Sequence, residues 1–334
     1  MKLGILGTGM IVKDLLTTIN KLKIESISIL GTEQTKKETT ILAKQYHLDH
    51  CYYDYDEMLR SEIDTVYVAL PNHLHFSFAK KALLKGKHVI MEKPITSNVK
   101  ELEELKEIAQ ENDLIILEAV NIHYLPAFKK LKEDIKRIGN IKIMNFNYSQ
   151  YSSRYDAFKQ GTILPAFDYH KSGGALMDIN VYNVNAIISL FGQPVSIGYM
   201  ANIENQIDTS GILMYDYGSF KGISIGAKDC KAPIISTIQG DKGVIKIDKP
   251  VNQMTGYQII FNDGTEEIYR VDDCEHRLYY EFIEFIRIID NNDYDFAKKM
   301  LELSLIVAKV MNEARNQEKI VFTNCLLYTS DAAD

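Results

Sequence analysis

The stretch that decides the fold is KLGILGTGMIV, residues 2–12. It starts as a short apolar strand, turns at Gly7-Thr8-Gly9, and continues into apolar residues at helical spacing, such as Ile11 and Leu15. Glycines in such a turn let the backbone approach a pyrophosphate. The third position of the motif, usually Gly or Ala, is Val12. We predict that a nucleotide binds at this turn, through Gly7, Thr8, Gly9, Met10 and Ile11.

Strands and helices alternate outward from this turn. Uninterrupted apolar runs are typical of strands that are buried on both faces of a parallel sheet. Helical patterns separate these runs, which favours a doubly wound arrangement. Residues 1–121 are therefore predicted to form an α/β Rossmann domain with a doubly wound parallel sheet. Its predicted strands are residues 2–6, 26–30, 65–70, 88–91 and 114–117, and its helices include 35–46, 72–85 and 99–111.

The pattern changes after residue 121 to stretches in which apolar and polar residues alternate, as in half-buried strands. One long helix is predicted at 174–191, and two more near the end at 279–289 and 295–316. We therefore predict that residues 122–324 form an α+β domain with a large, mostly antiparallel, open-faced sheet. The alternating stretches are 142–148, 196–203, 211–217, 221–227, 234–239, 243–248, 256–262 and 266–271.

Composition excludes several classes of protein. The chain has 334 residues and a net charge of −7, which argues against a nucleic-acid partner. No apolar run approaches the roughly 20 residues that span a bilayer, so no membrane association is predicted. Residues 2–6 enter a strand at once, so we expect no signal peptide.

The four cysteines lie far apart in the sequence and form no CxxC motif, so neither a disulfide framework nor a metal site is predicted. A reducing cytoplasm is the expected location. The last ten residues, CLLYTSDAAD at 325–334, read like one translated frame of a sequencing adapter. We interpret them as read-through that is not native; the alternative is a short polar tail. The cysteines are Cys51, Cys230, Cys274 and Cys325.

A second motif, KGKHVIMEKP at 85–94, places Glu92 and Lys93 at the carboxyl end of a predicted strand. In open α/β sheets, ligands bind outside this edge. An ammonium group there can polarise a hydroxyl or carbonyl oxygen. The alternative is an ordinary solvated lysine. Glu92 is expected either to pair with Lys93 or to bind the cofactor ribose.

A third motif is SGGALMDINVY at 172–182. With the glycine turn and the EKP motif, it resembles the Gfo/Idh/MocA oxidoreductases over almost the whole chain. The resemblance implies NAD or NADP as cofactor and Lys93 beside the hydride-transfer site. Asp178 and Tyr182 are four residues apart and are expected to share a helix face.

Many members of that family carry histidine where this chain has Tyr182, and the tyrosine resembles the glucose–fructose oxidoreductase and dihydrodiol dehydrogenase branches. A tyrosine is a poor base alone, but a nearby ammonium stabilises its phenolate. We therefore expect Lys93, Asp178 and Tyr182 to be catalytic. The alternative for the last two is a structural helix with a half-buried tyrosine.

The remaining expected contacts concern the two ends of the ligand site. An acid after the second strand favours NAD and a base favours NADP; Thr32, Glu33 and Lys36 leave this undecided. The nicotinamide end is assigned by resemblance, and the substrate residues partly by resemblance and partly by their polar character. The further expected cofactor contacts are Leu70, Pro71, Asn72 and His75 beneath the nicotinamide, together with Glu92 and Lys93, and the expected substrate contacts are His123, Arg154, Asp168, Asp178 and Tyr182.

These observations predict an NAD(P)-dependent dehydrogenase or reductase that acts on a hydroxyl or carbonyl carbon of a sugar, cyclitol or diol. The alternatives are a non-catalytic NAD(P)-binding regulator and an NAD-dependent glycosidase. A homodimer, or a dimer of dimers, is expected to form through the open sheet face. Tyr199, Met214, Tyr215, Tyr217 and Phe220 are the candidates for that face.

Overall fold

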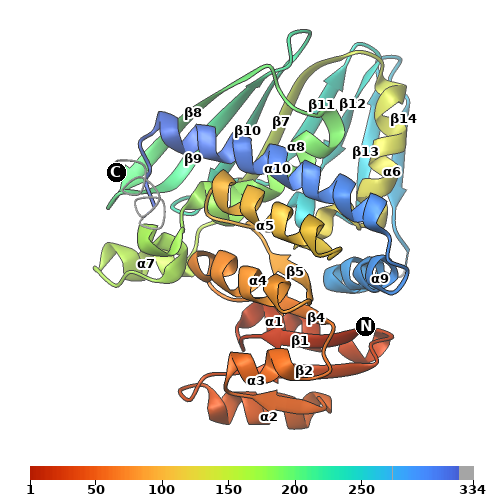
Figure 1. The fold of residues 1–334 in the computed structure, drawn as a ribbon. Coiled ribbons are helices and arrows are strands. Elements are labelled where there is room, and N and C mark those ends of the chain that lie inside the picture. Colours follow the sequence, from red (N-terminus) through yellow and green to blue (C-terminus); the bar gives the residue numbers. More distant parts are fainter. Residues whose placement is uncertain (273, 323–334) are drawn as a thin grey trace. The chain divides into compact units, whose positions relative to one another are not determined.

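The computed structural model describes residues 1–272 and 274–322. The chain divides into two compact units (Figure 1). The first unit holds residues 1–119 together with 275–305, and the second holds residues 120–272, 274 and 306–322 of the described chain. The sequence placed 275–305 with the second domain, whereas in the structure this segment returns to the first. The proposed adapter segment, 325–334, lies outside the described residues.

The first unit is built on a six-stranded sheet in the order β3-β2-β1-β4-β5-β6. All its neighbouring strands pair in parallel, which confirms the predicted doubly wound sheet. β3 was not predicted, because three residues are too few to show a pattern. The strands are β1 Lys2–Leu6, β2 Ser26–Leu30, β3 His50–Tyr52, β4 Thr65–Val68, β5 His88–Glu92 and β6 Ile116–Ala119.

Two helices of this unit, α3 and α5, begin at side-chain caps. Asp54 accepts the Glu57 N–H at 2.7 Å and starts α3 (Tyr55–Arg60). Asn98 accepts the Glu101 N–H at 3.0 Å and starts α5 (Val99–Glu111). The helix after the glycine turn is shorter than expected, because α1 ends at Leu16 and a 3-10 turn follows. The others are α1 Met10–Leu16, α2 Lys36–Tyr46, α4 His75–Leu84, α9 Arg277–Asp290 and the start of α10 Tyr294–Gln317.

The second unit is built on an eight-stranded sheet in the order β14-β13-β12-β11-β7-β10-β9-β8. Only the β7–β10 pair is parallel, so the sheet is mostly antiparallel, as predicted. Its strands are β7 Ile141–Ser149, β8 Ser196–Glu204, β9 Ile207–Asp216, β10 Lys221–Ala227, β11 Ser236–Gly240, β12 Gly243–Ile247, β13 Gly256–Phe261 and β14 Glu266–Arg270.

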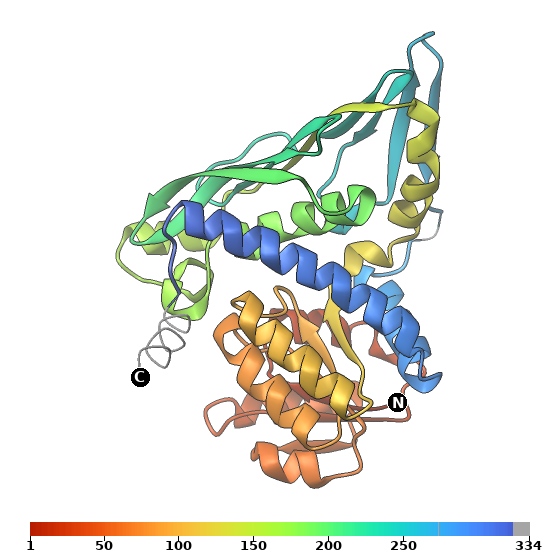
Figure 2. The ribbon, with the colours of Figure 1, turned by 45° about the horizontal axis from the view of Figure 1, so that its top comes forward.

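Two helices cover one face of this sheet: α6 (Pro126–Asp134) and α8 (Val181–Phe191) (Figure 2). A third helix, α7 (Ser153–Lys159), carries Arg154 and was not predicted from the sequence. The opposite face of the sheet, here called the outer face, is open. Its exposed apolar side chains are Ile143, Met200, Ile212, Met214 and Ile268, each more than 40% exposed.

Tyr199 and Tyr215 do not lie on the outer face, so their predicted exposure was wrong. They are only 4% and 2% exposed. The Tyr199 ring occupies the space above Gly211, where any larger side chain would overlap it. The Tyr199 hydroxyl donates to Asp208 at 3.0 Å. Of the predicted set, Met214 is 42% exposed and does lie on the outer face.

Tyr217 and Phe220 lie beyond the end of β9, in the turn before β10. Their rings stack with centroids 4.7 Å apart, and both rings also contact Phe191. They therefore form a small aromatic cluster at the sheet edge.

Within the described residues, no helix is both long enough and apolar enough to cross a membrane.

Candidate active site

The glycine turn is shaped by two different demands on its glycines. Gly7 has φ +102°, a left-handed conformation that favours glycine, and a β-carbon there would lie 3.0 Å from the Ala69 carbonyl oxygen. A β-carbon at Gly9 would meet nothing within 4 Å, so the backbone is open on that side. Val12 is fully buried and serves the core. The turn therefore fits the close approach of a pyrophosphate, despite the unusual third position.

The ribose end of the expected cofactor site follows β2. The Thr32 N–H donates to the Thr35 hydroxyl at 2.8 Å, which fixes the turn. Glu33 and Lys36 pair at 3.4 Å, and their side chains are 73% and 55% exposed. An exposed pair of this kind contributes little to stability, so either side chain can turn to a ligand. An acid and a base thus remain available for the ribose.

His75 takes a different place from the one expected. Its side chain is fully buried; Nδ1 lies 2.9 Å from the Pro94 carbonyl oxygen and Nε2 lies 2.8 Å from that of Leu70. Burial lowers the pKa of the ring, which favours the neutral form. The ring therefore lies between the segment after β4 and the segment after β5, and in its neutral form it donates to only one of the two carbonyl oxygens. Leu70, Pro71 and Asn72 are the more exposed residues of that stretch.

Lys93 follows the last residue of β5, at the carboxyl edge of the parallel sheet, and its side chain is half-buried. The neighbouring Glu92 is buried and accepts a hydrogen bond from the buried Tyr67 hydroxyl. Burial raises the pKa of Glu92, while the Tyr67 hydroxyl and the Lys93 ammonium lower it. Glu92 therefore faces the interior and contacts Tyr67. Lys93, in contrast, is partly exposed at the carboxyl edge of the parallel sheet.

Asp178 lies in a π-helical turn (Leu176–Asn180), and Tyr182 lies in the first turn of α8. The sequence predicted one continuous helix, so the simple i, i+4 relation between them does not apply. The turn packs closely on β10, because a β-carbon at Gly226 would meet the Asn180 side chain at 2.5 Å. Tyr182 is 9% exposed, and its ring centroid lies 6.2 Å from that of Tyr148.

Lys228 is the main site residue that sequence reasoning missed. It is 2% exposed, and its ammonium lies 2.6 Å from the Asp178 carboxylate and 2.9 Å from the Ala166 carbonyl oxygen. The same ammonium stands 4.4 Å from the centre of the Phe167 ring. A buried lysine needs such partners. The available signal was its position at the end of an apolar strand, as for Lys93.

Asp208 was also missed, and it holds the start of the π-helical turn. It is fully buried, and it accepts the Leu176 N–H at 2.6 Å as well as the Tyr199 hydroxyl. Burial raises its pKa to about 6. Gly174 has φ +104°, and a side chain there would overlap Asp208. Two buried groups therefore fix the turn that carries Asp178. Asp208 holds the first residue of the turn, Leu176, and Lys228 holds the Asp178 carboxylate.

The three further residues expected at the substrate take separate positions in the second unit. His123 Nε2 lies 3.2 Å from the Asn185 side-chain oxygen, and burial lowers the pKa of the ring to about 3. Asp168 accepts the His170 N–H at 3.0 Å and pairs with Lys171 at 3.4 Å. Arg154 is the second residue of α7 and is half-buried. His123 is therefore a neutral interior group, and Asp168 stabilises a local turn.

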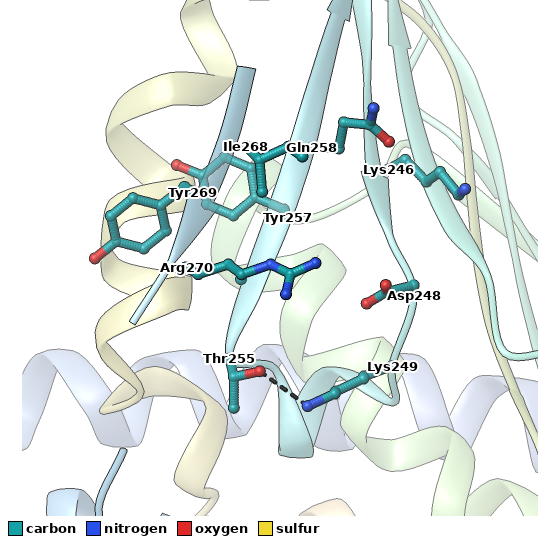
Figure 3. Close-up of a pocket in the computed structure, with 10 residues that line it drawn as sticks. Lys246, Asp248, Lys249, Thr255, Tyr257, Gln258, Ile268, Tyr269 and Arg270 are labelled. Carbon is teal, nitrogen blue, oxygen red and sulfur yellow. Dashed lines mark hydrogen bonds between the residues drawn. The ribbon is translucent and has the colours of Figure 1, made fainter. Parts of the chain in front are cut away.

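A pocket of about 210 Å³ opens elsewhere, on the outer face at β12, β13 and β14 (Figure 3). Arg270 extends across Gly256, where a β-carbon would lie 3.1 Å from the Arg270 Cγ. Lys249 donates to the Thr255 hydroxyl at 3.0 Å. None of the predicted site residues lines this pocket.

Within the described part of the chain, no group of three His, Cys, Asp or Glu residues could hold a metal ion.

Comparison with known proteins agrees with this geometry. Residues 1–119 match the model of an oxidoreductase family with an NAD-binding Rossmann fold. The chain is 34% identical to scyllo-inositol 2-dehydrogenase (NADP(+)) IolU of Bacillus subtilis, over 96% of this chain and 98% of that protein. It is 23% identical to mouse trans-1,2-dihydrobenzene-1,2-diol dehydrogenase, over 75% of each chain.

The solved structures show the same fold at lower identity. KijD10, a 3-ketoreductase from Actinomadura kijaniata crystallised with NADP and TDP-benzene, aligns with a TM-score of 0.82. The identity is 19%, and the alignment covers 95% of this chain and 97% of the other. These findings confirm the resemblance read from the three sequence motifs. The chain therefore belongs to the Gfo/Idh/MocA family and is an NAD(P)-dependent oxidoreductase that acts on CH–OH groups.

Proposed function

We propose that this oxidoreductase transfers a hydride between NAD(P) and a secondary alcohol carbon of a cyclitol, or of a related sugar or diol. The observation that carries the proposal is Lys93 at the carboxyl edge of the nucleotide-binding sheet. The named activities of the relatives support the substrate class, since they act on an inositol, a dihydrodiol and, in another case, D-xylose.

In this proposal the chain's own residues manage the alcohol proton. A bound nicotinamide would supply or accept the hydride. The Lys93 ammonium polarises the substrate oxygen, and the Tyr182 phenol exchanges the hydroxyl proton with it. Asp178 is held in place by the buried Lys228, and its proposed role is to orient the Tyr182 hydroxyl. The glycine turn at residues 7–9 holds the pyrophosphate, and Glu33 or Lys36 contacts the adenosine ribose.

The test is a substrate panel assayed with NAD⁺ and NADP⁺ separately, following the absorbance of the reduced nicotinamide. The panel contains scyllo- and myo-inositol, pentoses, hexoses and trans-diols. We expect turnover with at least one cyclitol, sugar or diol. Tight nucleotide binding without turnover of any of them would instead support a non-catalytic nucleotide sensor. Release of an aglycone from a glycoside would support the glycosidase.

We further propose a homodimer, or a dimer of dimers, that forms through the outer face. Met200 and Ile212 are direct cross-strand partners there and are 64% and 43% exposed. Ile143, on β7, is 51% exposed. A soluble protein seldom leaves such a group of apolar side chains in water.

The three described cysteines, Cys51, Cys230 and Cys274, are free thiols, which supports a reducing compartment such as the cytoplasm.

A further inference from the structure

The pocket at β12, β13 and β14 carries an excess of positive charge. Among the described residues that line it, Lys246, Lys249 and Arg270 are basic and Asp248 is the only acid. The whole chain, in contrast, has a net charge of −7. Positive charge gathered around a hollow raises the local concentration of small anions. The pocket therefore has the electrostatics of an anion site.

The register of the strands brings these side chains together. Lys246 of β12 lies opposite Gln258 of β13, which lies opposite Ile268 of β14. Two residues farther along β14, Arg270 lies opposite Gly256. Side chains two residues apart on a strand lie on the same face of a sheet, so Arg270 shares the outer face with Ile268. Basic side chains from β12 and β14 therefore flank the strand between them.

Gly256 creates the hollow, because it has no side chain between these two strands. A β-carbon there would overlap the Tyr269 carbonyl oxygen, so a larger residue does not fit. The Arg270 side chain extends over this bare stretch of backbone toward the side of the pocket that carries Asp248 (Figure 3). The volume of about 210 Å³ suits a small ligand better than a dinucleotide.

Arg270 is not used by the fold. Its side chain is exposed, and no hydrogen bond or ion pair joins it to another described residue. By contrast, Arg137, Arg277 and Arg287 pair with carboxylates at 2.6, 3.1 and 2.7 Å. A guanidinium presents five N–H groups in a planar fork that matches a carboxylate or a phosphate. Arg270 therefore keeps its donors for a ligand.

The lining also offers a fixed ammonium and two hydrogen-bond acceptors. Lys249 donates to the Thr255 hydroxyl at 3.0 Å, which holds its ammonium at the pocket (Figure 3). The Gln258 side-chain nitrogen donates to Glu266 at 2.7 Å, so the Gln258 oxygen is left to accept. The Asp248 carboxylate is the second acceptor. Hydroxyl groups beside an anionic group are the ligand chemistry that matches this lining.

We propose that this pocket is a second ligand site, which binds a small hydroxylated anion, either a phosphate or a carboxylate of a sugar or polyol. Arg270, Lys246 and Lys249 bind the anionic group, and Asp248 and Gln258 accept hydrogen bonds from the hydroxyl groups. None of the residues expected to bind nucleotide or substrate lines the pocket. The inference is therefore independent of the proposed function.

The pocket occupies a different part of the outer face from the exposed apolar pair Met200 and Ile212. That pair lies on β8 and β9, at one end of the sheet, and the pocket lies on the three strands at the other end. A dimer contact centred on β8 and β9 is therefore compatible with a ligand in the pocket.

Calorimetric titration of the nucleotide-free protein at fixed ionic strength tests the site. The probes are inorganic phosphate, D-glucose 6-phosphate and D-gluconate, and the last two show whether phosphate or carboxylate is preferred. We expect D-glucose 6-phosphate to bind more tightly than inorganic phosphate, because its hydroxyl groups add contacts. Arg270→Gln and Lys246→Gln should each weaken binding by about fivefold or more. Absence of binding by all three probes, or wild-type affinity in both variants, would overturn the proposal.

Lys221→Gln is the matched control for lost charge. Lys221 is an exposed cation of the same sheet, on β10, and it already pairs with Asp216 at 2.9 Å. Its replacement should leave probe binding unchanged, whereas a loss equal to that of Arg270→Gln would show a general charge effect and overturn the site. Because Arg270 is exposed, the melting temperature of Arg270→Gln should stay close to that of wild type.

Asp248→Asn tests the role of the acid, with an effect of opposite sign. The variant removes negative charge from the lining, so inorganic phosphate should bind more tightly than to wild type. D-glucose 6-phosphate should lose part of its advantage over inorganic phosphate, because the carboxylate acceptor for its hydroxyl groups is gone. Weaker binding of inorganic phosphate to Asp248→Asn would contradict the assigned geometry.

The glycine turn at residues 7–9 is the competing place for a phosphate. Phosphate bound there would be displaced by one equivalent of NADP⁺ and would be insensitive to Arg270→Gln, and this result would overturn the proposal. For the proposed site, we expect one equivalent of NADP⁺ to leave the phosphate titration unchanged, and Arg270→Gln to leave NADP⁺ binding unchanged. These titrations involve no turnover, so failure of the proposed dehydrogenase activity is detected separately.

Discussion

Lys93 is the residue on which the proposed chemistry depends. The variant Lys93→Met keeps most of the side-chain volume and removes the charge. We expect nucleotide binding to change little, while turnover falls by about 10² or more, the usual scale for lost acid–base or electrostatic help. Binding is measured by nucleotide fluorescence and turnover by the absorbance assay. Lys85→Met is the matched control, because Lys85 is exposed near the start of the same strand. Equal turnover in Lys93→Met and wild type would remove Lys93 from the reaction.

Tyr182 allows the hydroxyl to be separated from the ring. Tyr182→Phe keeps the contact with Tyr148 and removes only the oxygen. We expect it to lose nearly as much turnover as Tyr182→Ala, while its melting temperature stays close to that of wild type. Turnover and thermal unfolding of both variants decide the matter. A Phe variant with near-normal turnover would assign the proton transfer to Lys93.

The π-helical turn at Leu176–Asn180 is the element that presents Asp178. Its position depends on Lys228, whose ammonium pairs with Asp178 at 2.6 Å. We expect Lys228→Met to cost about 2 kcal/mol of stability, less than for a fully buried pair, because Asp178 is partly exposed and regains water. Turnover should fall as well, since Asp178 loses its fixed position.

The control for this element is Lys221→Met on the same strand. Lys221 pairs with Asp216 at 2.9 Å, but both side chains are exposed, 59% and 40%. Its loss should change stability by no more than about 0.5 kcal/mol. Urea unfolding of both variants makes the comparison. Similar losses for Lys228→Met and Lys221→Met would show that the buried lysine does not hold the turn.

At the scale of the whole molecule, the outer face is expected to join two copies. Ile212→Lys places a charge among exposed apolar side chains and should convert a dimer into a monomer. Light scattering at micromolar concentration measures the mass. Ile41→Lys is the control, since Ile41 is 53% exposed on α2 of the first unit. A monomeric wild-type protein would contradict the proposed assembly.

The sequence allowed both sheets to be predicted, because each kind of sheet leaves a clear pattern. Buried parallel strands are apolar throughout, as at 65–70, and open antiparallel strands alternate, as in β10. The alternation of apolar and polar residues did not predict which side chains are buried where a single glycine changes the packing. Gly211 makes room for Tyr199 on the buried side, which alternation alone does not reveal.

A site residue could be predicted where a reactive side chain lies at the carboxyl end of a predicted strand, as Lys93 does. Lys228 and Asp208 were missed because their importance comes from burial and from partners distant in sequence. The return of 275–305 to the first unit is a tertiary feature, and no linker marks it in the sequence.

That return has a consequence for how the protein is made. A ribosome releases residues 1–119 first, with all six strands of the parallel sheet, but α9 emerges only after the long segment 120–274 of the second unit. Until then, Tyr67 and Glu92 lack the helix that covers them, and the nascent sheet exposes apolar surface. The nucleotide-binding unit is thus the first to be started but stays incomplete until residues 275–305 follow the long insertion of the second unit, and cofactor capture should follow release of that segment.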